Sequence, residues 1–143
     1  MQIAFYKGPA TGITNKLGRL LVCVGTLSKY SHCELVINGM CYSASARDGG
    51  VRAKRIDLAS GHWDVVDVPG DAMRALMWFH AHQGQAYDWV GVLRFALPFL
   101  RQRPGKWFCS EAAAEALGVA DSAGVSPGDL WEVYASCAEG IPR

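Results

Sequence analysis

The chain has 143 residues, 50% of them hydrophobic, and a formal net charge of +1. This length predicts one domain, residues 1–143, that can bury a core without metals or disulfides. The composition excludes a disordered tail, and the balanced charge argues against a nucleic-acid binder. Two basic clusters are interpreted as solvated faces or loops: Arg52, Lys54 and Arg55, and then Arg94, Arg101, Arg103 and Lys106.

The cysteines at positions 23, 33, 41, 109 and 137 form no C-x-x-C pair. An odd count without paired spacing fits neither a disulfide framework nor a zinc knuckle, so we expect reduced thiols and no cofactor. The amino terminus lacks the basic region and apolar core of a signal peptide. We therefore expect a cytoplasmic protein, or a phage-encoded one released by another route.

Sequence patterns predict strands followed by helices. Strands are expected at residues 2–6, 31–37, 40–45, 51–56 and 63–68, and Asn38-Gly39 favours a hairpin between the second and third. Helices are expected at 15–24, at 72–83, from Tyr87-Asp88 towards Pro98, from the cysteine at 109 to Gly118, and over 127–134. This order indicates an α+β domain in which the strands form an antiparallel meander.

The most apolar run, Trp89 to Leu100, is interrupted by Arg94 and Pro98 and is too short to span a bilayer. We therefore expect no transmembrane segment. Five apolar residues in this run favour the protein core, although they could instead line a groove for an acyl chain: Val92, Leu93, Phe95, Leu97 and Phe99.

Cys109 stands at the expected start of an alanine-rich helix, in Trp107-Phe108-Cys109-Ser110-Glu111. The unpaired N–H groups and positive dipole end of a helix favour a thiolate over a thiol. A cysteine at this position is a candidate nucleophile. Such a nucleophile also needs a base within reach.

His32 is the best-placed base, because it heads a predicted strand while the histidines at 62, 80 and 82 fit solvent or interior positions. Side chains alternate along a strand, so His32 and Glu34 project together while Cys33 points the other way. Glu34 could orient the imidazole if it folds back across the roughly 7 Å between the two backbone positions. Ser43 or Ser45, on the next strand, competes for this role, and His32 could also be a structural residue of an edge strand.

Cys33 and Cys41 are interpreted as small buried hydrophobic residues. A metal site made from His32, Cys33, Cys41 and His62 is disfavoured, because these residues lack paired ligand spacing.

The order of motifs over residues 1–118 resembles the circularly permuted NlpC-like branch of the papain-fold enzymes, the YiiX/YaeF-like group. A Ser31-His32-x-Glu34 strand comes first, Tyr42-Ser43-Ala44-Ser45, Gly49-Gly50-Val51 and Tyr87-Asp88 follow, and Trp107-Phe108-Cys109-Ser110-Glu111 comes late. The resemblance implies a papain-like domain, with an antiparallel sheet or half-barrel packed against helices. It makes Cys109 the nucleophile and His32 the general base. The family usually has an acidic or amide residue near position 43, so the third member stays open among Glu34, Ser43 and Ser45, in that order.

The implied activity is hydrolysis of an amide or ester bond in a cell-wall peptide, another amide or a lipid acyl group. The backbone N–H of Cys109 would meet the oxyanion, and Tyr87 would donate a second bond or contact substrate, unless it is a structural tyrosine. The alternative is a non-catalytic papain-like module that binds a peptide or lipid in a phage or bacterial assembly.

Overall fold

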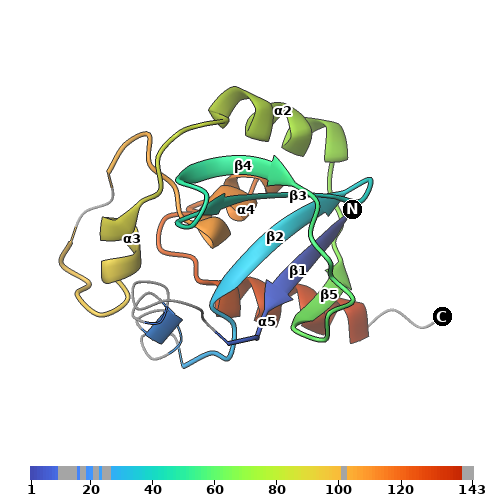
Figure 1. Cartoon of the computed structure of the whole chain (residues 1–143), viewed down its shortest axis with the longest axis horizontal. Coiled ribbons are helices and arrows are strands. Elements are labelled where there is room, and N and C mark those ends of the chain that lie inside the picture. The colour runs from blue at the N-terminus through green and yellow to red at the C-terminus, as the bar shows by residue number, and fades with distance from the viewer. Residues whose placement is uncertain (10–15, 17–18, 21–22, 24–26, 101–102, 140–143) are drawn as a thin grey trace.

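The computed structural model describes residues 1–9, 16, 19–20, 23, 27–100 and 103–139, and most of the helix predicted at 15–24 lies outside these residues. An α+β architecture is confirmed, with five strands and, among the described residues, four helices (Figure 1). The strands are β1 (Gln2–Tyr6), β2 (His32–Ile37), β3 (Met40–Ser45), β4 (Gly50–Lys54) and β5 (Trp63–Asp67). The helices are α2 (Ala72–His82), α3 (Trp89–Leu93), α4 (Cys109–Leu117) and α5 (Pro127–Glu139).

All pairs in the sheet are antiparallel, in the order β4-β3-β2-β1-β5. The predicted meander is confirmed for β2, β3 and β4. It is wrong for β5, which pairs with β1 at the opposite edge, with Tyr6 opposite both His32 and Trp63. His32 is therefore at the end of the central strand and not on an edge strand.

One face of the sheet carries the main core. Ile3, Phe5 and Leu35 lie on this face, fully buried with the alanines of α4. Because these alanines are small, α4 packs closely on β2 and β3, and α5 lies beside it behind the sheet (Figure 1). This packing holds the first residue of α4 close to the start of β2.

Residues after α3 differ from the prediction. The helix ends at Leu93, well before Pro98. After it the chain forms turns closed by hydrogen bonds, such as the one that the Ala96 N–H donates to the Leu93 carbonyl. The expectation that this run belongs to the core is confirmed for Val92, which is buried. It is wrong for three residues that lie exposed: Leu93, Leu97 and Phe99.

Two more boundaries differ by a few residues: β4 ends at Lys54 and α5 continues to Glu139. Among the described residues, none of the helices combines the length and apolar character needed to cross a membrane.

The segment that leads from α2 towards the site runs close to the backbone of β4. The Val51 N–H donates to the Gln85 carbonyl at 2.9 Å, and Gly84 N–H donates to the Val51 carbonyl at 2.9 Å. Gly50, at φ +152°, permits this approach, because a Cβ there would overlap the Gln85 carbonyl oxygen. A parallel bridge then joins Tyr87 to Trp107, which places Tyr87 beside the start of α4.

Candidate active site

Cys109 is the first residue of α4, as the sequence predicts. The preceding Phe108 is extended and offers no side-chain cap, so the N–H groups of the first turn are left for other acceptors. The residue is only 3% exposed. Water therefore screens little of the electrostatic interaction between its sulfur, the positive end of the helix dipole and the neighbouring charges.

Glu34 folds back along β2 and contacts His32, with 2.7 Å between the carboxylate Oε1 and the ring Nε2. Arg52, from β4, holds the same carboxylate with two hydrogen bonds of 2.5 and 2.6 Å. Glu34 is fully buried, so the guanidinium supplies the charge that a buried carboxylate requires. This arrangement occupies Nε2 and leaves Nδ1 as the ring nitrogen available to Cys109.

Cys109 and His32 lie close enough for each to shift the pKa of the other. Burial would lower the pKa of His32, but the Cys109 charge and the hydrogen bonds to Cys109 and Glu34 raise it to about 10. A hydrogen bond from the Cys33 side chain and the charge of His32 hold the pKa of Cys109 well below its ordinary value, although burial opposes them. Both shifts favour the thiolate–imidazolium form of the pair over the neutral thiol and imidazole.

The predicted burial of Cys33 and Cys41 is confirmed, and Cys33 also contributes to the electrostatics of Cys109. Its side chain hydrogen-bonds to Cys109, while burial, followed by this bond and the Cys109 charge, raises the pKa of the Cys33 thiol well above its ordinary value. Cys33 therefore remains an S–H donor to the thiolate. The alternation itself holds, since Cys33 lies on the core face, and α4 reaches it there.

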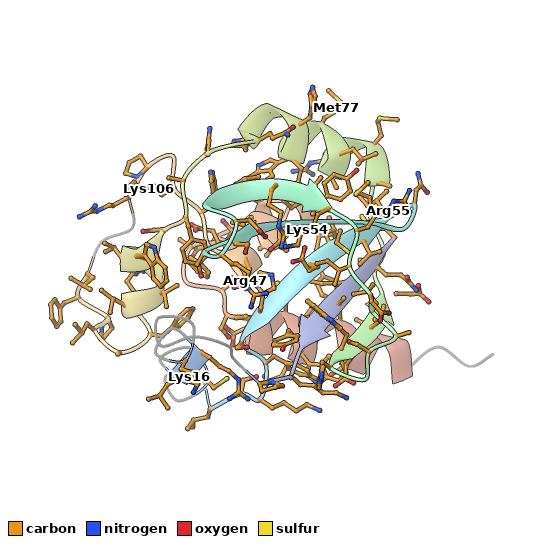
Figure 2. All side chains as sticks on the ribbon, in the orientation of Figure 1. Lys16, Arg47, Lys54, Arg55, Met77 and Lys106 are labelled. Carbon is orange, nitrogen blue, oxygen red and sulfur yellow. The ribbon has the colours of Figure 1, made fainter. Side chains whose placement is uncertain are left out.

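A cavity of about 400 Å³ adjoins His32 on the sheet face opposite the main core. Its walls include the aromatic side chains of Tyr6, Trp63, Tyr87 and Trp89, and four cations line it: Arg19, Arg47, Arg52 and Lys54. Arg47 and Lys54 lie over this face of the sheet (Figure 2). Arg52 forms ion pairs with Glu34 and Asp48, and Lys54 forms one with Asp48.

A smaller cavity of about 290 Å³ lies between α2 and the strands β3 and β4. His32 lines the larger cavity and not this one, so the candidate site is placed at the larger cavity.

Tyr87 lines the larger cavity and lies within electrostatic range of Cys109. Burial, followed by the negative charges of Cys109 and Asp88, raises the pKa of Tyr87 well above its ordinary value. The phenol is therefore protonated and can donate. Cys109 itself is not part of the lining and borders the cavity through these neighbours.

The two serine candidates have other partners. The Ser43 hydroxyl donates to the Cys33 carbonyl at 2.7 Å, and the Ser45 hydroxyl accepts from the Asp48 N–H at 3.4 Å. Of the three candidates for orienting His32, Glu34 is the one that the geometry joins to it.

Sequence reasoning missed Arg52, which was interpreted as part of a solvated face. One signal could have found it, because a buried carboxylate needs a cation nearby. Arg52 lies in β4, where it pairs with Ser43 of β3. The Cys33 contact had no such signal, because it depends on how α4 docks.

The arrangement can perform nucleophilic chemistry: a thiolate, a charged imidazole, an orienting carboxylate and a phenol donor lie together. Among the described residues, no group of three or more His, Cys, Asp or Glu side chains is arranged to hold a metal ion. The chain matches no protein-family model, and no curated protein matches it.

Proposed function

We propose that this chain is a cysteine hydrolase that cleaves an amide or ester bond, built on a permuted papain-like fold. The observation that carries the proposal is His32, bonded to the buried Glu34 on one side and interacting with Cys109 at the start of α4 on the other. The histidine strand precedes the cysteine helix in the chain, which is the order of the permuted branch.

The chemistry follows from these positions. The Cys109 thiolate attacks the acyl carbon, and the carbonyl oxygen takes the negative charge while the backbone N–H of Cys109 and the Tyr87 hydroxyl donate to it. The imidazolium of His32 then protonates the leaving amine or alkoxide, and an acyl-thioester remains on Cys109. Neutral His32 removes a proton from water, the resulting hydroxide equivalent attacks the thioester, and the thiolate and imidazolium are restored.

Glu34 is a positioning residue in this scheme. Its bond to Nε2 fixes the ring so that Nδ1 faces the sulfur, and its charge stabilises the imidazolium. Arg52 in turn keeps Glu34 ionised: burial would raise the pKa of Glu34, but the bonds from Arg52 and His32 hold it below its usual value.

The cavity walls support a substrate with an apolar body and a negatively charged group. Aromatic rings from Trp63 and Trp89 suit an acyl chain or a peptide side chain, while the cations that line the cavity suit a carboxylate or phosphate. Cell-wall peptides, other acidic amides and lipid acyl groups all fit this description.

A non-catalytic binding module is the second candidate. The observation that favours it is the burial of Cys109, which is 3% exposed and does not line the cavity. A ligand could therefore occupy the cavity without reaching the sulfur.

The deciding experiment is turnover of a panel of acidic and neutral p-nitrophenyl esters and anilides, together with intact-mass detection of an acyl adduct. We expect wild-type protein to form an adduct at Cys109, and Cys109→Ala to lose turnover by at least about 10³-fold. Cys41→Ala is the matched control, because Cys41 is equally buried but lies on the other sheet face. Saturable ligand binding without an adduct, unchanged in Cys109→Ala, would instead establish the binding module.

A further inference from the structure

The segment that follows α3 exposes large apolar side chains beside the candidate site. Leu93 is 38% exposed, Leu97 42% and Phe99 76%. We call these three residues the apolar tip. Figure 1 shows that α3 and the turns after it lie at the side of the molecule, away from α2 and from the C-terminal end. Exposed apolar side chains that are grouped in this way mark interaction sites more often than scattered ones.

The backbone of the apolar tip is held by hydrogen bonds and by packing against the rest of the protein. Its backbone closes into turns, with Leu97 N–H donating to the Leu93 carbonyl at 2.8 Å and Leu100 N–H to the Leu97 carbonyl at 3.1 Å. Phe95 points inward, and its ring packs edge-on against Phe108 with centroids 5.6 Å apart. The segment therefore has an anchored inner side and an apolar outer side.

The stretch of chain that contains the tip carries charge of one sign. Residues 89–107 contain four basic residues and no acidic residue, although the whole chain has 14 basic and 13 acidic residues. Arg94 lies close enough to Glu111 for its charge to lower the pKa of that carboxyl group. Arg103 is exposed. Lys106 is half-buried and lies on the α3 side of the molecule (Figure 2). These two cations are available to an anionic partner.

We propose that the apolar tip, with Arg103 and Lys106, is a docking site for an anionic lipid surface. Aromatic and aliphatic side chains enter the boundary between headgroups and acyl chains, while neighbouring cations are attracted to the anionic headgroups, each by about 1 kcal/mol. A protein partner of ordinary affinity needs roughly 800 Å² on each side, which three side chains on a short turn do not supply. The acid-free stretch also favours a negatively charged surface over a second copy of this nearly neutral chain.

Docking in this way would hold the candidate site at the lipid surface. Trp89, the first residue of α3, is 47% exposed and lines the larger cavity. A bound surface would therefore lie next to the cavity mouth. Lipid binding does not require hydrolysis, so the docking proposal can be tested independently of the proposed function.

Vesicle co-sedimentation of the full chain carrying Cys109→Ala tests the proposal, because this background removes any turnover of lipid. We expect binding to phosphatidylcholine vesicles that contain about one-third phosphatidylglycerol, little binding to pure phosphatidylcholine, and weakening in about 0.5 M salt. Leu97→Ala with Phe99→Ala is expected to weaken binding at least about tenfold, and Arg103→Glu with Lys106→Glu by a similar factor.

Met73→Ala with Met77→Ala is the matched control. These methionines are 64% and 67% exposed on α2, away from the tip, so this variant is expected to bind as the parent does. Equal binding by the tip and control variants would overturn the proposal, as would a failure to sediment with anionic vesicles. A tip variant that abolishes self-association while vesicles capture none of the parent would assign the tip to a second copy instead.

Discussion

At the scale of single residues, the charge of His32 depends on Glu34. Replacing Glu34 with Gln keeps the shape of the side chain but removes the charge that helps to raise the pKa of His32 to about 10. We expect the pKa of His32 to fall, that of Cys109 to rise, and kcat/KM to drop by roughly 10²-fold. The pH dependence of kcat/KM for wild-type and variant protein measures all three effects.

Asp48→Asn is the control for this change. Asp48 binds the Arg52 Nε at 2.7 Å, so the variant also deprives Arg52 of an acid but leaves the bond between Glu34 and His32 intact. A loss of activity as large in Asp48→Asn as in Glu34→Gln would mean that Glu34 acts through stability alone.

Cys33 offers a second test at this scale. Cys33→Ala removes the S–H donor whose hydrogen bond does most to lower the pKa of Cys109. We expect the pH midpoint of Cys109 alkylation to move upward, because the thiolate loses a charge-assisted hydrogen bond. Cys41→Ala removes a thiol of similar burial on the other face and should leave the midpoint in place.

At the scale of elements, the approach of residues 84–87 to β4 positions Tyr87. Gly50→Ala would drive a Cβ into the Gln85 carbonyl at a φ of +152°, and we expect the free energy of unfolding to fall by about 2–4 kcal/mol. Urea denaturation monitored by circular dichroism measures this free energy of unfolding. At Gly49, also at positive φ, a Cβ meets no atom within 4 Å, so Gly49→Ala should cost only about 1 kcal/mol. Equal losses in the two variants would contradict the account of this approach.

The first turn of α4 contributes a pH-dependent stability. Burial, reinforced by the charge of Asp88, raises the pKa of Glu111 from 4.5 to about 7, although a backbone hydrogen bond at Phe108 opposes this shift. Between these two values the folded state binds more protons than the unfolded state, so stability falls as the pH rises from 4.5 to 7.

Glu111→Gln removes this titration. The wild-type protein is expected to lose up to about 3 kcal/mol across that interval, and the variant much less. Chemical denaturation at a series of pH values measures the difference, with Glu115→Gln, one turn later and half-buried, as the control. A wild-type stability that rises over the same interval would disprove the assignment.

At the scale of the whole molecule, local patterns predicted most of the elements and the start of α4. The Asn38-Gly39 turn predicts the β2–β3 hairpin because the turn chemistry is local. The pairing of β5 with β1 was missed, since strand periodicity contains no information about which edge a distant strand joins.

In the candidate site, too, local contacts could be predicted and long-range contacts could not. Strand alternation placed His32 and Glu34 on one face, and their hydrogen bond follows from neighbouring positions in one strand. Contacts made by docking of separate elements could not be predicted: Arg52 reaches Glu34 from β4, and Cys33 meets Cys109 because α4 lies on the core face of β2.

The central claim is that Cys109 is a thiolate paired with a protonated His32. The rate of its alkylation by iodoacetamide, followed by peptide mass spectrometry from about pH 4 to pH 10, tests this claim most directly. We expect a midpoint well below the ordinary 9.0 in wild-type protein, and a midpoint shifted towards 9.0 in His32→Ala. A wild-type midpoint near that of a free thiol, unchanged when His32 is removed, would contradict it.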